Sequence, residues 1–165
     1  MITRQAGPDD GPALASLDRN NTAYPWSQEQ YLTLCAGANP HRWALVAEAG
    51  GDGLQGFVAC EQVLDEASIL NIVVARASRG RGLGRALMAA ALRRMSEAGV
   101  RRCHLEVRAS NDVARRLYAT LGFAETGLRR GYYRDSGSRE DARVFSLRLD
   151  PDPDIPESET MNNSQ

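Results

Sequence analysis

A turn rich in glycine and arginine joins an apolar run to an amphipathic one, and its residues could hold an anion. The turn comprises Arg79, Gly80, Arg81, Gly82, Leu83, Gly84 and Arg85. The β-branched run at 69–74 predicts a buried strand, and apolar residues spaced three and four apart after Leu83 predict a helix. A helix N-terminus attracts anions, and arginine forks onto phosphate oxygens. The turn therefore predicts a pyrophosphate site, with a tight turn bearing solvated arginines as the alternative.

Two nucleotide-binding motifs are excluded at this turn. The dinucleotide pattern G-x-G-x-x-G needs a third glycine where Leu87 stands, three residues after Gly84. The P-loop pattern needs a lysine followed by serine or threonine, and the chain contains no lysine. A nucleotide-binding protein is therefore disfavoured.

A carboxylate and a phenol follow the turn in sequence. Glu106 lies in residues 102–108, where alternating apolar side chains predict a strand, and Asn111 suits a helix N-cap. Tyr118 stands seven residues after Asn111, two turns along the same helix face. Each residue also has a purely structural explanation. These explanations are an ion pair of Glu106 with Arg101, Arg108 or Arg143, a core position for Tyr118 and simple capping by Asn111.

Four aromatic residues are the candidates for binding an acceptor: Tyr24, Trp26, Tyr132 and Tyr133. They could line a groove for an extended peptide end, or they could pack the ends of hairpins. Acidic residues at 65, 66, 140 and 141 would favour a basic peptide.

Composition predicts one globular domain with a short acidic tail. The chain has 165 residues, 42% of them hydrophobic and 25% charged, with a net charge of −1. Five acids and three prolines fall in residues 150–165, which we expect to be disordered. In residues 1–149, twenty arginines face sixteen acids, a net charge of +4 that suits an anionic ligand better than a nucleic acid.

Cysteine and histidine usage predicts neither disulfides nor a metal site. The three cysteines, Cys35, Cys60 and Cys103, are odd in number and lack CxxC spacing, and the two histidines are far apart in sequence. No apolar run is long enough to cross a membrane, and no signal peptide pattern precedes residue 30. We therefore expect a cytoplasmic protein that binds neither metal, membrane nor nucleic acid.

The elements that must position these residues predict an α+β fold. Strands are expected at 1–5, 43–49, 54–64, 67–75, 102–108, 123–130 and 142–149, with a long polar turn at 131–141. Helices are expected from Pro8, at 27–35, at 83–98 and from Asn111 to Leu121. Strands 67–75 and 102–108 are joined by a helix and should lie parallel in a mixed sheet.

Residues 79–84 fit the pattern [Gln/Arg]-x-x-Gly-x-[Gly/Ala] and lie between a predicted strand and a predicted helix. This arrangement resembles the acetyl-CoA pyrophosphate loop of the GCN5-related N-acetyltransferases, the GNAT family. The resemblance extends over residues 1–149. It implies a GNAT fold in which two splayed parallel strands hold acetyl-CoA. By resemblance, Ile72, Val73 and Val74 line the pantetheine arm and acetyl group. Backbone amides of residues 80–85 hold the pyrophosphate, and Asn111 contacts the arm or the adenosine part.

Further stretches are similar to RimI-type ribosomal-protein-alanine N-acetyltransferases, among them Pro25-Trp26-Ser27, Leu64-Asp65-Glu66-Ala67 and Arg139-Glu140-Asp141-Ala142. This similarity implies acetyl transfer to the N-terminal alanine of a small-subunit ribosomal protein. Glu106 would be the base, directly or through water, and Tyr118 the acid. Because no Ser/His/Asp set or Cys–His pair is recognisable, direct attack by the amine is expected. The alternatives are a small-molecule amine N-acetyltransferase and a CoA-binding regulatory module without turnover.

Overall fold

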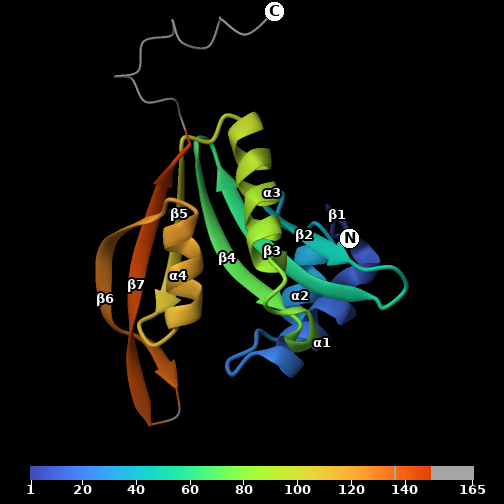
Figure 1. The fold of residues 1–165 in the computed structure, drawn as a ribbon, viewed down its shortest axis with the longest axis horizontal. Coiled ribbons are helices and arrows are strands. Elements are labelled where there is room, and N and C mark those ends of the chain that lie inside the picture. Colours follow the sequence, from blue (N-terminus) through green and yellow to red (C-terminus); the bar gives the residue numbers. More distant parts are fainter. Residues whose placement is uncertain (136, 150–165) are drawn as a thin grey trace, which may run out of the picture.

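The computed structural model describes residues 1–135 and 137–149, which form a mixed sheet with helices on both faces (Figure 1). The strands are β1 (Ile2–Gln5), β2 (Arg42–Glu48), β3 (Leu54–Val63), β4 (Glu66–Val74), β5 (Arg102–Arg108), β6 (Ala124–Asp135) and β7 (Ser138–Arg148). The α-helices are α1 (Gly11–Asn21), α2 (Gln28–Cys35), α3 (Leu83–Glu97) and α4 (Asp112–Thr120). The predicted α+β architecture of about seven strands and four helices is confirmed. The acidic tail at 150–165 lies outside the described residues.

The sheet opens between its two parallel strands. The strand order is β1-β2-β3-β4-β5-β7-β6, and only β4 and β5 are parallel, as the helical crossover predicted. Their pairing joins Glu66–Ile69 to Arg102–Leu105 and then stops, although both strands continue. At the same level the register between β3 and β4 shifts, because Leu70 is an extra residue in β4. The predicted gap between splayed strands therefore begins just beyond Ile69 and Leu105.

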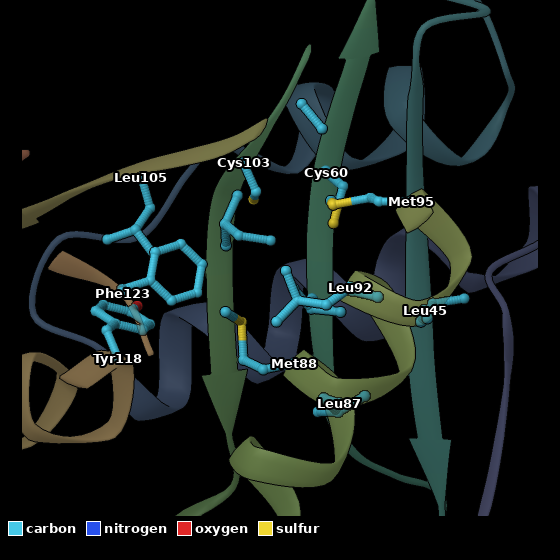
Figure 2. Packing of buried hydrophobic residues seen from close by; sticks show 14 of the residues in the cluster. Leu45, Cys60, Leu87, Met88, Leu92, Met95, Cys103, Leu105, Tyr118 and Phe123 are labelled. Atoms are coloured by element: carbon cyan, nitrogen blue, oxygen red, sulfur yellow. The ribbon is translucent and has the colours of Figure 1, made fainter. Parts of the chain in front are cut away.

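Two hydrophobic clusters cover the two faces of the sheet. Alternation along β2 sends Leu45 to the face under α3 and Val46 to the face under α1 and α2. Figure 2 shows the first cluster, in which Leu87, Met88, Leu92 and Met95 of α3 lie against side chains of the central strands. Because Tyr118 belongs to this cluster, the core that supports α3 also fixes one of the candidate catalytic residues.

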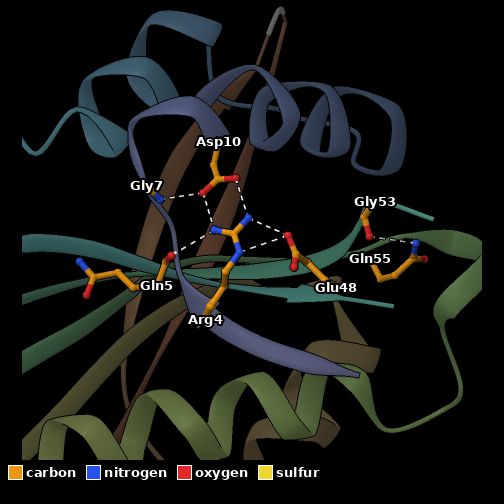
Figure 3. Close-up of polar contacts among 7 residues, drawn as sticks. All are labelled: Arg4, Gln5, Gly7, Asp10, Glu48, Gly53 and Gln55. Atoms are coloured by element: carbon orange, nitrogen blue, oxygen red, sulfur yellow. Dashed lines mark hydrogen bonds and ion pairs between the residues drawn. The ribbon is translucent and has the colours of Figure 1, made fainter. Parts of the chain in front are cut away.

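Arg4 joins the edge strand β1 to its neighbours (Figure 3). Its guanidinium lies between two carboxylates, 2.7 Å from Asp10 and 2.7 Å from Glu48 on β2. Asp10 also accepts the Gly7 N–H at 2.6 Å, which orders the turn before α1. Asp10 precedes α1, but it makes no side-chain cap bond to that helix. The hydrogen bonds from Arg4 hold the pKa of Asp10 below its usual range.

The β6–β7 hairpin corrects one prediction. Residues 131–141 were expected to be a long polar turn, but β6 runs to Asp135 and β7 begins at Ser138. The two strands stay paired up to Asp135 and Ser138. A register shift between Arg129 and Tyr133 bends the hairpin. These residues belong to a sheet-edge hairpin in which Tyr133 and Asp135 contact Arg108, whereas Tyr132 and Arg134 are exposed. The inward face is therefore polar and lacks the apolar alternation that predicts a strand.

Candidate active site

A cavity of about 780 Å³ occupies the gap between β4 and β5. Residues of β4, the glycine turn, β5, α4 and the α1–α2 loop line it. It collects most of the predicted site residues: Tyr24, Trp26, Ile72, Val73, Val74, Arg79, Gly80, Gly82, Leu83, Gly84, Arg85, Glu106, Asn111, Tyr118 and Tyr133. Arg81 and Tyr132 are not among the lining residues. Segments separated by up to about a hundred residues thus meet in one cavity.

The glycine turn has the backbone conformation that an anion loop needs. Gly80 and Gly82 take left-handed conformations, with φ of 76° and 78°. A Cβ atom built on either glycine would meet no atom within 4 Å, so there is open space beside the loop. Gly82 is the N-cap of α3, whose first N–H groups are left for a ligand. The loop therefore fits a pyrophosphate held by backbone amides.

Two arginines of the turn, Arg79 and Arg85, make hydrogen bonds within the fold. Arg79 donates from Nε to the Val74 carbonyl at 3.1 Å and from Nη2 to the Asn21 carbonyl at 2.9 Å. Its guanidinium therefore ties β4 to the end of α1. Arg85 donates to the Thr120 hydroxyl of α4 at 3.1 Å. Because the Arg79 guanidinium already donates to backbone carbonyls, we expect phosphate to be bound mainly by the backbone amides of the loop.

The start and the middle of α4 supply two lining residues. Asn111 is the N-cap, and its side chain accepts the Ala114 N–H at 3.1 Å, so the capping prediction is confirmed. Tyr118 is 5% exposed and packs against Phe123 and Phe145. Burial, together with the nearby Tyr133 phenol, raises the pKa of Tyr118 well above its usual value. The phenol therefore keeps its proton at neutral pH, as a proton donor must.

Glu106 faces the cavity from β5 with a partner that was not predicted. Arg129 of β6 lies with Nε 3.0 Å from Glu106 Oε1, in a pair whose arginine is 57% exposed. Two of the arginines considered as partners are engaged elsewhere: Arg108 pairs with Asp135 and Glu140, and Arg143 with Glu125. A hydrogen bond with Glu106 also raises the pKa of Tyr132, which places that phenol beside the carboxylate. The exposed pair leaves Glu106 accessible to an acceptor.

An arginine and two tyrosines join the α1–α2 loop to the β6–β7 hairpin. The Arg108 guanidinium carbon lies 3.6 Å from the ring centroid of Tyr24 and 4.1 Å from that of Tyr133. Burial raises the pKa of Tyr133 to about 12. Trp26 stacks on Tyr31, and Tyr132 meets Tyr133 edge to face. Of the four predicted aromatic residues, Tyr24, Trp26 and Tyr133 thus line the cavity, and Tyr132 lies beside Tyr133 outside it.

Among the lining residues that were not predicted are two charged side chains, Asp18 and Arg108. A signal for Asp18 was present, because this acid follows Leu14 and Ala15 on the apolar face of α1, at spacings of four and three residues. No sequence pattern pointed to Arg108, since the tyrosine rings and carboxylates that it contacts come from distant segments of the chain.

The four acids considered for a basic peptide lie in two separate places, at 65–66 and at 140–141. Asp65 and Glu66 lie in a second, smaller cavity together with Arg101 and Arg102. Glu140 pairs with Arg108 and accepts the Ser110 N–H, and the Asp141 carboxylate accepts the Gly131 N–H. Glu66, Glu140 and Asp141 therefore each have a partner within the fold, that of Glu66 being His104. In the part of the chain that the structure describes, no group of three or more metal-ligating side chains is found, and no helix could span a membrane.

Comparison with known proteins identifies the family. The Acetyltransferase (GNAT) family model matches residues 12–123. The [ribosomal protein bS18]-alanine N-acetyltransferase of Salmonella typhimurium is 36% identical over 138 residues, which span 84% of this chain and 90% of that protein. The protein of the same name from Escherichia coli K12 is also 36% identical over 138 residues. These relatives cover nearly the whole described chain.

Solved structures share the fold. The ribosomal-protein-S18-alanine N-acetyltransferase from Escherichia coli superimposes with a TM-score of 0.81 at 30% identity, covering 94% of this chain and 99% of that one. NAA60 of Arabidopsis thaliana, solved in complex with acetyl-CoA, gives a TM-score of 0.79 at 22% identity, a likeness of fold. The parted strands, the glycine loop and these relatives together show that the chain belongs to the GNAT family and is an acetyl-CoA-dependent N-acetyltransferase.

Proposed function

We propose that this chain acetylates the N-terminal α-amine of a protein, most directly the N-terminal alanine of a bS18-type ribosomal protein in the cytoplasm. The observation that carries the proposal is the single cavity in which Glu106 and Tyr118 meet the glycine loop and aromatic side chains. The shared name of the curated relatives supports the acceptor. The aromatic side chains in the cavity wall, Tyr24, Trp26 and Tyr133, suit the extended end of a chain.

The cavity supports the binding of acetyl-CoA along its length. The amides of residues 80–85 would hold the pyrophosphate at the N-terminus of α3. Ile72, Val73 and Val74 lie on the part of β4 beyond its pairing with β5, so this edge of the strand is open to the amides of the pantetheine arm, apart from the Val74 carbonyl, which accepts a hydrogen bond from Arg79. Asn111 lies at the opposite wall, on α4. Acetyl-CoA supplies the acetyl group as a thioester.

The proposed chemistry assigns one proton to each of two residues. An α-amine has a pKa of about 7.7–8.0, so a base must free its lone pair for attack. Glu106 would take that proton, directly or through a water molecule. Tyr118, whose pKa is raised by burial, would hold the proton that the leaving sulfur needs. Backbone N–H groups near Val73 and Val74 would polarise the carbonyl that is attacked.

Mass spectrometry of acetylated peptides tests the proposal. The protein is incubated with acetyl-CoA and peptides that begin with alanine, serine, methionine or a bulky residue, while free thiol is followed. We expect one acetyl group on the α-amine of the alanine peptide and a marked preference for that first residue. A peptide with a chemically blocked N-terminus but free lysines is the matched control and should remain unmodified.

Two other outcomes would redirect the assignment. Thiol release with small amines alone would make the chain a small-molecule amine N-acetyltransferase. Binding of acetyl-CoA with no transfer to any acceptor would make it a CoA-binding regulatory module and would remove the roles given to Glu106 and Tyr118.

A further inference from the structure

Asp18 of α1 lines the cavity although only 1% of the residue is exposed. Its Oδ1 accepts the Thr22 hydroxyl at 2.5 Å. Its Oδ2 accepts the Tyr31 hydroxyl at 2.5 Å and the Trp26 backbone N–H at 2.9 Å. Burying a carboxylate is costly unless donors surround it. The hydrogen-bond donors therefore fix the Asp18 carboxylate in place, and we call this set of hydrogen bonds the Asp18 junction.

The junction brings together three parts of the fold. Thr22 and Trp26 belong to the α1–α2 loop, and Tyr31 lies on α2. The third part is β4, because Asn71 donates to Asp18 Oδ2 at 3.3 Å and to the Tyr31 oxygen at 2.9 Å. Asn71 follows the extra residue Leu70, at the level where β4 leaves β5. Asp18 therefore links the loop to the part of β4 where the cavity opens.

Neither catalysis nor packing accounts for Asp18. Both carboxylate oxygens already accept hydrogen bonds, and Oδ2 accepts three, so the group is poorly placed to take a proton from an acceptor. Packing on this face of α1 is supplied by Leu14, which is fully buried in the same cluster. The remaining role for Asp18 is to fix the conformation of residues 22–26, which include Tyr24 and Trp26. On its far side this loop is fixed by the contact of Tyr24 with Arg108.

We propose that Asp18 is a positioning residue. It fixes residues 22–26 relative to β4, so that this loop forms the side of the cavity that receives the acceptor. The proposal rests on the proposed function, because it assigns this loop to the acceptor. Cofactor binding should not depend on Asp18. Val73 and Val74 are held by their pairing with Phe57 and Gly56 of β3, and the hydrogen-bond donors to Asp18 named above do not include a residue of the glycine turn.

Steady-state kinetics of Asp18→Asn test the proposal. Asparagine keeps the volume but replaces one accepting oxygen with an NH₂ group, which cannot accept the hydrogen bonds that this oxygen now receives. We expect the KM for the alanine-starting peptide to rise about tenfold or more, because bonds to a buried charged group are lost. We expect the dissociation constant of acetyl-CoA to change less than about twofold. Leu14→Ala is the matched control, since it loosens the same helix by packing alone and should lower Tm without raising the peptide KM.

Hydrogen exchange gives a readout that does not need turnover. In Asp18→Asn, amides of residues 22–27 should exchange faster, while those of residues 80–85 should keep their wild-type rates. An unchanged peptide KM, an equal loss of acetyl-CoA affinity, or the same KM change in Leu14→Ala would overturn the proposal. If the wild-type protein acetylates no peptide, the proposed function fails by itself. Hydrogen exchange at residues 22–27 then tests the positioning role of Asp18 separately. Unchanged exchange rates in Asp18→Asn would overturn that role, and faster rates would support it.

Discussion

Glu106 is the residue on which the proposed chemistry depends most directly. It lines the cavity from β5, and its exposed pairing with Arg129 leaves it within reach of an acceptor amine. Glutamine in its place keeps the shape but cannot take a proton. We expect Glu106→Gln to lower kcat about 100-fold or more, the usual contribution of a general base. The dissociation constant of acetyl-CoA, measured by calorimetry, should stay unchanged.

Glu125→Gln is the matched control for Glu106. Glu125 is also a strand glutamate paired with an arginine, 3.2 Å from Arg143, but it does not line the cavity. Its variant should keep wild-type kcat. If Glu106→Gln retained more than about half of the wild-type kcat, another group would have to serve as the base.

Tyr118 should act through its proton, not through its ring. Tyr118→Phe keeps the packing against Phe123 and Phe145 and removes only the hydroxyl. We expect kcat to fall about tenfold or more, with little change in Tm. Because burial holds the pKa of Tyr118 above its usual value, the phenol stays protonated and the loss should be uniform from about pH 6 to about pH 9. A loss confined to one end of that range would contradict this role.

At the residue level, sequence reasoning identified individual side chains better than their partners. Asn111 was predicted as an N-cap and caps α4, because capping depends on residues only three apart. The partner of Glu106 was not predicted, since Arg129 reaches it only through the pairing of β7 with both β5 and β6. The bond from Asn71 to Asp18 joins residues 53 apart, and no local pattern encodes it.

At the level of elements, the turn between β4 and α3 gives the next prediction. Gly82 has a φ of 78° and lines the cavity, whereas Gly99, after the end of α3, has a φ of 85° and does not. Alanine at either position should cost about 1 kcal/mol of stability, because a Cβ atom disfavours the left-handed conformation. Only Gly82→Ala should also weaken acetyl-CoA binding, by about tenfold or more, since its Cβ atom enters the open space beside the loop.

Thermal unfolding and calorimetric titration of both variants check this prediction. Gly99→Ala is the control that shows the cost of the backbone conformation alone. Equal effects of the two substitutions on acetyl-CoA affinity would mean that the glycine turn is structural and holds no ligand.

The bounds of elements whose buried residues recur at regular spacings were predicted nearly correctly, and the bounds of the β6–β7 hairpin were not. The strand–turn–helix unit of β4 and α3 has buried positions at regular spacings, so its bounds could be read from the sequence. The β6–β7 hairpin was predicted only in part: residues 124–130 of β6, all exposed, were expected to be a strand, but the continuation of β6 to Asp135 was not. Its pairing is specified by the opposite strand and by a register shift, neither of which is visible in local sequence.

At the level of the whole molecule, the cavity exists because the two faces of the sheet are stabilised independently. One cluster holds α3 against the central strands, and the other holds α1 and α2 against the opposite face. The parallel strands can therefore part beyond Ile69 without loss of the core. The order of elements predicted the mixed sheet, but the junctions at its periphery come from side chains brought together only by folding.

Arg4 is one of these junctions, and its contribution to stability should depend on pH. The arginine holds the pKa of Asp10 below its usual value near 3.8. A carboxyl with a depressed folded-state pKa stabilises the fold above its unfolded pKa, and this contribution is lost as pH falls through the folded pKa. Arg4→Met should therefore lower the free energy of unfolding at pH 7 by about 2 kcal/mol, and much less at about pH 2. Arg42→Met, which breaks the more exposed pair with Glu61, should cost under about 1 kcal/mol. Urea unfolding at both pH values measures the difference, and a cost for Arg4→Met that did not shrink in acid would assign the effect of Arg4 to packing of its side chain.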